Sequence, residues 1–477
     1  MKRDDEVLGL DALGQAALVR AKQVSPLELL EAALARIERV NPALNAVVIR
    51  LDDVAREQAR NVRLEAPLAG VPFLLKDLIA EAAGTRFTEA SAFLRDFVSE
   101  EDSELVRRYR RAGLILAGKT NTPEMGVGPT TESRLHGPAR NPWDPQRTAG
   151  GSSGGAAAAV AARLVPMAHG NDAGGSIRVP AACCGVFGMK PTRGRNPLGP
   201  RYGDLLGGLA AEHALTLSVR DSAALLDATA GPDAGDPYWA PPPARAWLAE
   251  VGAPPGKLRI AFSARPIMGG EPHAEARAAV EDAAKLAESL GHELAEDAPQ
   301  LDGERFFLCF TGVLASGFTW GIEYWERRTG RSASAEHFEP FVWSLTSRGR
   351  EFTAPQYLAM VEELQACSRV IGRFFERYDV WLTPTLGSPP VPLGTFRYEG
   401  GDPFAVRRRM AAFTPFTYIA NATGQPAMSV PTWWTAEGLP LGTQWIGRFG
   451  EEATLYRLAA QLEQARPWAG RRPPICA

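Results

Sequence analysis

Apolar and polar positions along this chain repeat with a helical period in some segments and form short apolar runs in others. The segment Ser25-Pro26-Leu27-Glu28 combines a capping box with proline at the first helical position. Apolar residues then recur at helical spacing, which predicts an amphipathic helix. Further along, the pattern predicts a strand over 71–75, a helix from about 103, a strand over 114–117, a helix after 155 and a strand near 165. This alternation predicts an α/β fold.

A proline-rich stretch over 237–255 interrupts the alternation and is expected to be a surface connection. After it, KLRIAFSA predicts another strand, and the residues from His273 to Leu290 predict another helix. No internal repeat divides the chain.

Two glycine-serine clusters carry the candidate chemistry: GGSSGG around Ser152 and DAGGSIR around Ser176, 24 residues further on. Glycine allows turns in which backbone N–H groups converge on one point. A lysine, Lys76, ends the apolar run GVPFLLKDL, which would bring its amine into the interior. A serine hydroxyl needs a base, and a lysine can be that base if burial makes it neutral near pH 7. Two serines and a lysine can therefore cleave an amide bond.

Each of these features also has a simpler interpretation. Isolated glycine-serine clusters are most often flexible linkers. A lysine after an apolar run most often reaches water at a strand end. Here the first cluster runs directly into AAAAVAARLV, a good helix former, and a second cluster follows. That combination favours a site over a linker.

The chain resembles the amidase signature family of serine hydrolases nearly from end to end. The resemblance rests on the two clusters with Lys76 and on further segments in the same order: SPLELLEAALARIERVNPALNAV, GKTNTPEMG, SVRDSAALLDATAGPDAGDP, YDVWLTPT, TGQPAMSVP and GLPLGTQWIGR. It implies one domain over 1–477, with a large mixed, twisted β-sheet core covered by α-helices on both faces. The catalytic core would span about 65–235, and a helical region over about 300–410 would form the substrate cleft.

Carried over to this sequence, the family pattern makes Ser176 the nucleophile, Ser152 a bridging serine on a cis peptide bond, and Lys76 the base. Backbone N–H groups from Ala173, Gly174 and Gly175 to the nucleophile itself would hold the oxyanion. Val127 is a candidate substrate-binding position. The residues Asp172 and Arg178 would support the loop without a chemical step. One position departs from the family, because Asn171 stands where threonine or serine is usual.

Two other motifs fit by letter but not by context. The run from Gly113 to Thr120 matches the phosphate-loop pattern GxxxxGK[ST], which needs a strand before its first glycine and a helix after its threonine. Here the middle positions are themselves the expected strand, and Gly113 is expected to end the preceding helix. The run Gly150–Gly154 matches GxSxG, but a loop precedes it where a nucleophile elbow needs a strand. None of the six histidines has a sequence context that marks it as a base, and only His169 is expected near the chemistry.

Composition narrows the choice of partners. The 477 residues are 45% hydrophobic and 22% charged, with a net charge of −3. No basic stripe is present, so we expect no nucleic-acid partner. No apolar run approaches the length of a spanning helix, and the N-terminus lacks a signal core, so we expect no membrane contact. Five cysteines show no metal spacing, which predicts reduced thiols, a cytoplasmic location, no metal and no cofactor. The adjacent Cys183 and Cys184 are expected in a buried helix.

The substrate is the least determined part. The variant GNDAGGSIR and the run EHALTLSVRDSAALLDATAGPDAGDPYW look most like the branch of nylon-oligomer and cyclic-dimer hydrolases. This implies a small-molecule partner, a bulky, aryl, cyclic or oligomeric amide or a carbamate. The alternatives are the A subunit of a tRNA-dependent amidotransferase, although its GYYDAYY-like run is missing, and a noncatalytic relic. A homodimer is left open. Cys309 and the aromatic residues over 302–410 are expected to be mostly core rather than pocket wall.

Overall fold

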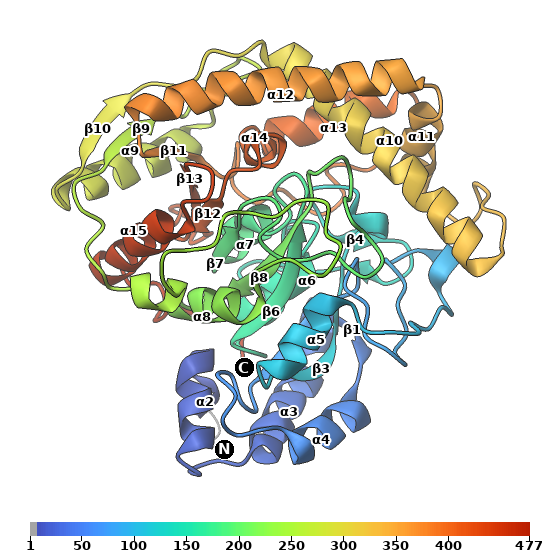
Figure 1. The fold of residues 1–477 in the computed structure, drawn as a ribbon, viewed down its shortest axis with the longest axis vertical. Coiled ribbons are helices and arrows are strands. Elements are labelled where there is room, and N and C mark those ends of the chain that lie inside the picture. Colours follow the sequence, from blue (N-terminus) through green and yellow to red (C-terminus); the bar gives the residue numbers. More distant parts are fainter. Residues whose placement is uncertain (1–6) are drawn as a thin grey trace.

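A mixed sheet of eleven strands organises the computed structural model, which describes residues 7–477 (Figure 1). Its strand order is β1-β3-β2-β6-β8-β7-β12-β13-β11-β9-β10. Parallel pairs join β3, β2 and β6 near one end and β11, β9 and β10 at the other, while the strands between them pair antiparallel. Strands from both halves of the chain thus share one sheet, and the expected α/β fold with a large mixed sheet is confirmed.

The sheet and one two-stranded ribbon contain the following strands: β1 Val47–Arg50, β2 Pro72–Lys76, β3 Ile115–Thr120, β4 Glu132–Ser133, β5 Gly137–Pro138, β6 Met167–Asp172, β7 Phe187–Lys190, β8 Ala211–Thr216, β9 Arg259–Phe262, β10 Glu293–Glu296, β11 Val380–Pro384, β12 Ala427–Val430 and β13 Thr443–Gly447. The helices are α2 Ala12–Arg20, α3 Pro26–Leu44, α4 Asp52–Asn61, α5 Glu104–Arg111, α6 Gly154–Ala161, α7 Arg178–Cys184, α8 Val219–Thr229, α9 Ala274–Ser289, α10 Gly303–Thr329, α11 Pro340–Gly349, α12 Ala354–Arg377, α13 Pro403–Phe413, α14 Thr417–Thr423 and α15 Glu452–Ala465.

The strand β2 shows why helices cover both faces of the sheet. All of its residues are buried, and successive side chains of a strand point to opposite faces. Leu74 packs in a core cluster with α3, α6 and α7. Phe73 and Leu75 pack in another cluster with α2, α5 and α8. A strand covered on both faces must be apolar throughout, as the run before Lys76 is.

Most elements expected from the pattern lie where the sequence places them. Ser25 caps α3 in a capping box, and Pro26 is its first residue. Ser103 caps α5, and Gly113 follows that helix with a φ of +88° before β3 begins. The helix α9 begins after His273. The phosphate-loop interpretation of this region therefore fails on context, because the matching residues form β3 itself.

The helix α10 corrects one expectation. By length and composition it could cross a membrane, although no apolar run was expected to come near that limit. Its most apolar window is 56% buried inside the protein, which is the behaviour of a core helix packed against α11 and α12.

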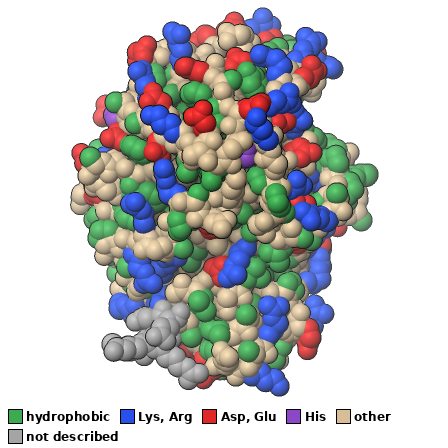
Figure 2. Space-filling model, turned by 90° about the vertical axis from the view of Figure 1, so that its left-hand side faces the viewer, with side chains coloured by type: hydrophobic (Ala, Val, Ile, Leu, Met, Phe, Trp, Pro, Cys, Tyr) green, Lys and Arg blue, Asp and Glu red, His purple; other side chains and the backbone are tan. Residues whose placement is uncertain are grey.

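On the face seen in Figure 2, lysine and arginine side chains are interspersed with aspartate and glutamate.

Candidate active site

Two parallel neighbouring strands bring the candidate base to one edge of the sheet. Lys76 is the last residue of β2, and Asn171 and Asp172 end β6 beside it. The Nζ atom of Lys76 lies 2.7 Å from Ser152 Oγ and 2.6 Å from Asn171 Oδ1. The structure therefore joins Lys76 to the first glycine-serine cluster through a direct hydrogen bond.

The environment of Lys76 favours a neutral amine. Its side chain is fully buried. Burial lowers the pKa of Lys76 to about 7, although the charges of Glu212 and Asp172 act in the opposite direction. Neither carboxylate forms an ion pair with Nζ, and both polar partners of Nζ are uncharged. Near neutral pH a substantial fraction of Lys76 can therefore accept a proton.

The GGSSGG cluster is a tightly held turn rather than a linker. The peptide bond between Gly151 and Ser152 is cis, as the family pattern implies. Thr131 Oγ1 donates to the carbonyl of Gly150 at 2.9 Å and accepts from the N–H of Gly154 at 3.2 Å. A Cβ atom on Gly155 would lie 2.5 Å from two backbone atoms of neighbouring segments. The second half of this cluster needs glycine because α6 packs against backbone there.

The loop of Ser176 leaves three backbone donors open. The N–H of Gly175 donates to Asp172 Oδ1 at 2.7 Å, and those of Ile177 and Arg178 donate to Oδ2. Within residues 7–477, no acceptor meets the N–H groups of Ala173, Gly174 and Ser176. The N–H of Gly175 was one of the expected oxyanion donors, but it already donates to Asp172. Of the expected donors, those of Ala173, Gly174 and Ser176 remain open.

The two serine hydroxyls lie at the same cavity but are not hydrogen-bonded to each other. Ser152 and Ser176 both line it. Of the described hydrogen bonds, Ser152 Oγ makes one to Lys76, and none connects it to Ser176. Catalytic hydrogen bonds are often long without substrate and tighten in the substrate complex.

A buried ion pair supports the loop of Ser176. Arg178 contacts Asp172 through Nη2–Oδ1 at 2.8 Å and Nε–Oδ2 at 3.0 Å. Burial works to raise the pKa of Asp172, but the Arg178 guanidinium lowers it well below its usual range. Asn421 donates to the carbonyl and carboxylate of Asp172, and Thr417 Oγ1 donates to the carbonyl of Gly174. The supporting role expected of Asp172 and Arg178 is confirmed, and α14 completes it.

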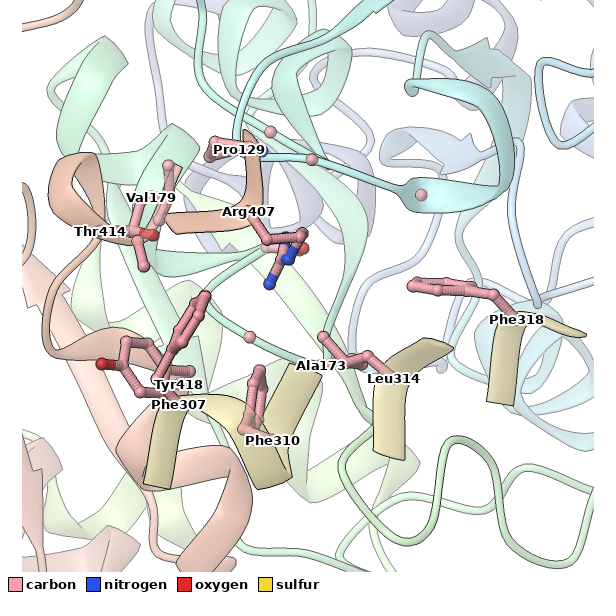
Figure 3. Close-up of a pocket in the computed structure, with 17 residues that line it drawn as sticks. Pro129, Ala173, Val179, Phe307, Phe310, Leu314, Phe318, Arg407, Thr414 and Tyr418 are labelled. Carbon is pink, nitrogen blue, oxygen red and sulfur yellow. The ribbon is translucent and has the colours of Figure 1, made fainter. Parts of the chain in front are cut away.

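Two cavities flank Ser176. The first, shown in Figure 3, has space of about 60 Å³ for the centres of water molecules, and the second about 70 Å³. One water molecule needs ~10–15 Å³. The first is lined by Gly126, Gly128, Pro129, Gly151, Ala173, Gly174, Gly175, Ser176, Val179, Phe307, Phe310, Leu314, Phe318, Arg407, Ala411, Thr414 and Tyr418. The second is lined by Leu78, Ile79, Glu89, Met125, Gly126, Ser152, Asn171, Ala173, Ser176, Tyr202, Leu205, Leu206, Gly317, Phe318, Trp320, Gly321, Tyr324 and Trp325.

The aromatic residues of α10 serve the cavities more than the sequence predicted. Phe307 and Phe310 line the first cavity, and Trp320 and Trp325 line the second. Most aromatic residues over 302–410 do pack in two core clusters, as expected. The exceptions lie on α10, because this helix runs along both cavities and periodicity does not distinguish a core side from a cavity side. Cys309 packs instead at the margin of an apolar cluster, in line with its core interpretation.

Val127 lies beside the site without reaching either cavity at Ser176. Its side chain is buried in an aromatic cluster and borders a separate hollow with Gly128 and Met410. Its substrate-binding role stays a prediction.

None of the six histidines lines either cavity beside Ser176. His169 Nδ1 accepts from the backbone N–H of Lys76 at 3.2 Å, and its Nε2 contacts Glu212. This confirms that His169 lies near the candidate chemistry. His213 contacts Ser222 in the core. Among residues 7–477, no group of three histidine, cysteine or carboxylate side chains is arranged to hold a metal ion, and the five cysteines are free.

Sequence reasoning missed three groups. Asn171 was noted only as a departure, whereas it contacts Lys76 directly. Arg407 belongs to an RRR run that is typical of an exposed helix face, and Glu89 had no signal. Arg407 reaches the first cavity through the packing of α13, and Glu89 reaches the second through the packing of the segment before residue 92.

Comparisons with known proteins agree with this geometry. A family model described as Amidase matches residues 28–456. A 6-aminohexanoate-cyclic-dimer hydrolase from Paenarthrobacter ureafaciens is 38% identical over 98% of this chain and 96% of its own. A solved structure of a 6-aminohexanoate cyclic dimer hydrolase complexed with substrate matches at a TM-score of 0.95, with 37% identity over 98% of this chain and 100% of its own.

A bacterial aryl acylamidase structure matches at a TM-score of 0.88, with 28% identity over 97% of this chain and 99% of its own. These likenesses favour an amide hydrolase over the A subunit of an amidotransferase. The chain is an amide-hydrolysing enzyme and belongs to the amidase signature family.

Proposed function

We propose that Ser176 is the nucleophile of this hydrolase, that Ser152 relays its proton, and that Lys76 is the terminal base. The observation that carries the proposal is the 2.7 Å contact between Lys76 Nζ and Ser152 Oγ, made by a buried amine whose two polar partners are uncharged. A neutral amine has one lone pair, which can accept the hydroxyl proton of Ser152.

In the first half-reaction the Ser176 oxygen bonds to the carbonyl carbon of the amide. Its proton passes to Ser152, whose own proton passes to Lys76. The carbonyl oxygen becomes an oxyanion, which the open N–H groups of Ala173, Gly174 and Ser176 would stabilise. When the carbon–nitrogen bond breaks, the protons return by the same route to the leaving nitrogen, and an acyl group remains on Ser176.

In the second half-reaction water replaces the amine. The relay takes a proton from water as its oxygen bonds to the acyl carbon, and the bond to Ser176 breaks with return of the proton to the serine. Removal of one donor to an oxyanion costs ~3 kcal/mol of barrier stabilisation in comparable enzymes. The loop of Ser176 thus supplies much of the rate acceleration.

The substrate is a small-molecule amide with a bulky, aryl, cyclic or oligomeric group, or a carbamate of similar shape. The aromatic lining of both cavities suits such groups. The two named relatives act, by their names, on a cyclic amide dimer and on aryl acylamides. We place the enzyme in the cytoplasm, since its five cysteines are free.

Covalent labelling tests the nucleophile, because a serine nucleophile attacks the phosphorus of a fluorophosphonate, expels fluoride and stays phosphonylated. The enzyme is treated with a fluorophosphonate, and the labelled peptide is identified by mass spectrometry. We expect the adduct on Ser176 and its loss in Ser176→Ala, while Ser289→Ala on the surface of α9 labels as the wild type does. A panel of p-nitroanilides, lactam dimers and aryl carbamates then ranks substrates. An adduct on another serine would overturn the assignment, and inactivity on the whole panel would overturn the substrate class.

A further inference from the structure

An unpaired arginine lies in the wall of the first cavity. Arg407 belongs to α13, and Figure 3 shows its guanidinium pointing into the space between the lining side chains. Among described residues its only hydrogen-bond partner is Met410 Sδ, 3.9 Å from Nη1, and no carboxylate pairs with it. Its Nε atom is buried without a partner. The next residue, Arg408, pairs at the surface with both oxygens of Glu304.

The side chain of Arg407 is partly exposed at the cavity, where its guanidinium has no carboxylate partner. Burial lowers the pKa of Arg407 to about 10, so the group still carries its charge at neutral pH. No aspartate or glutamate lines this cavity, whose residues all lie in the described part of the chain. Buried charges are normally paired, because desolvation is otherwise uncompensated. A guanidinium presents planar donors that match a carboxylate with two parallel hydrogen bonds.

The positions of Ser152 and Ser176 relative to the two cavities indicate which part of a bound substrate would lie next to Arg407. Ser152 and Asn171 line the second cavity, whereas Gly174, Gly175 and Arg407 line the first, and Ser176 borders both. In the proposed function Ser152 protonates the leaving nitrogen, so the leaving amine lies toward the second cavity. The acyl group then extends into the first cavity, toward Arg407.

We propose that the first cavity binds an acyl group with a terminal carboxylate, and that Arg407 is its counterion. The substrate class is therefore the monoamides of dicarboxylic acids, with a short methylene or aryl spacer against Phe307 and Phe310. This inference rests on the proposed function for the orientation of the substrate. The carboxylate site itself rests on the unpaired guanidinium and the acid-free lining.

Matched acyl p-nitroanilides test the preference. Succinyl, glutaryl and adipoyl anilides are compared with butyryl, valeryl and hexanoyl anilides, so that each pair differs by a carboxylate in place of a methyl group. We expect wild-type kcat/KM to favour the acid in at least one pair. In Arg407→Gln that preference falls by about 30-fold or more, the usual effect of removing one partner of a buried charge pair. The control Arg408→Gln keeps the wild-type ratio.

Three kinetic outcomes would overturn the carboxylate site while leaving the amidase function intact. The wild type could show no acid preference in any pair. Arg407→Gln could keep the wild-type ratio. Its rate could also fall equally on both members of a pair, which would place the guanidinium on the oxyanion instead of on the acyl tail.

A binding measurement separates failure of this site from failure of the proposed function. In the Ser176→Ala background, glutaranilic acid is titrated by calorimetry against the protein with Arg407 or with Arg407→Gln. We expect the dissociation constant to rise by about 30-fold or more in the second protein. The melting temperature of Arg407→Gln should not be lower than that of the parent, because the change removes an unpaired charge. Equal affinity of the two folded proteins would refute the carboxylate site, whatever the nucleophile proves to be.

Discussion

Asn171 accepts a hydrogen bond from Lys76 through Oδ1 at 2.6 Å, and its Nδ2 donates to the carbonyl of Leu78 at 3.1 Å. Because the amide nitrogen is committed to Leu78, the oxygen must face Lys76. A neutral amine has two N–H groups and one lone pair. With one N–H held by Asn171, the lone pair is free to face the hydroxyl of Ser152, as the proposed relay requires.

The first prediction concerns the charge at position 171. In Asn171→Asp a carboxylate would contact Lys76 and raise its pKa, because a nearby negative charge favours the ammonium form. We expect the acidic limb of kcat/KM to move up by roughly 1–3 pH units. At pH 7 the rate should fall about fivefold or more, since a smaller share of Lys76 is then neutral. A pH-rate profile from pH 5 to pH 10 on one anilide measures both changes.

Asn171→Ser is the control for this change. A hydroxyl is uncharged and can still accept from Lys76, and serine is a usual residue of the family at this position. Its acidic limb should stay near that of the wild type. If the aspartate variant showed the wild-type limb, Lys76 would not be the group that titrates.

The second prediction is the pH dependence of the wild type itself. Burial lowers the pKa of Lys76 to about 7, so the base form grows as pH rises through 7 and is complete above it. We expect kcat/KM to rise along this limb and then level. Lys76→Ala should lose the limb and about 10²–10⁴-fold in rate, a typical contribution of a general base. Partial recovery at high pH is expected as hydroxide takes over.

A second buried lysine supplies the control. Burial also lowers the pKa of Lys190 to about 7, but its Nζ donates to the carbonyl of Pro191 and reaches neither cavity. Lys190→Met should keep the limb near pH 7. Loss of the limb in this variant, with its retention in Lys76→Ala, would contradict the assignment of the base.

Sequence reasoning could identify Lys76, Ser152 and Ser176 as one candidate site because each lies next to the boundary of a recognisable helix or strand. A buried strand ends at Lys76, a glycine turn precedes α6, and a second glycine turn precedes α7. Such local signals predict positions along the chain. The amidase signature motifs then supplied the roles, which no single sequence pattern contains.

The residues that support the loop of Ser176, and the arginine that lines the first cavity, could not be predicted from local sequence signals. Thr417 and Asn421 contact the loop of Ser176 from more than 200 residues further along the chain. Arg407 is one of three successive arginines, and only the packing of α13 turns it into the cavity while Arg408 stays at the surface. Period and composition say which residue types occur on a helix, but the direction in which each side chain points depends on tertiary packing.

The third prediction concerns Gly175 in the loop of Ser176. Its φ is +128°, and a Cβ atom there would lie 2.5 Å from Thr417 Oγ1 and 2.7 Å from Thr417 Cβ. Gly175→Ala should push the loop away from α14 and misplace the open N–H groups beside it. We expect kcat to fall about 10²–10³-fold, the usual effect of a lost oxyanion donor. Steady-state kinetics on one anilide measure the effect.

A glycine with a similar backbone serves as the control. Gly235 has a φ of +96°, but a Cβ atom there would meet nothing within 4 Å. Gly235→Ala therefore carries the backbone strain without the clash, and its kcat should stay near the wild-type value. Wild-type kcat in Gly175→Ala would show that the loop tolerates displacement and that its donors do not hold the oxyanion.

The fourth prediction concerns the pH dependence of stability that arises from Glu89 in the wall of the second cavity. Its Oε2 atom accepts from Trp325 Nε1 at 3.2 Å. Burial raises the pKa of Glu89 from 4.5 to about 8, with smaller contributions from Asp77 and Glu81. Between these two pH values the folded protein keeps a proton that the unfolded chain has lost. This group therefore lowers the free energy of unfolding progressively as pH rises through that range.

Glu89→Gln removes this contribution, since glutamine stays neutral and its carbonyl can still accept from Trp325. We expect the variant to match the wild type near pH 5 and to gain in melting temperature relative to it as pH rises, with the difference levelling above pH 8. Thermal unfolding at unit steps of pH measures the difference, and Glu288→Gln on the exposed face of α9 should give none. A constant difference at every pH would mean that Glu89 ionises alike in both states. The cavity beside Ser152 would then hold a charge, instead of the neutral acid that its burial among aromatic side chains favours.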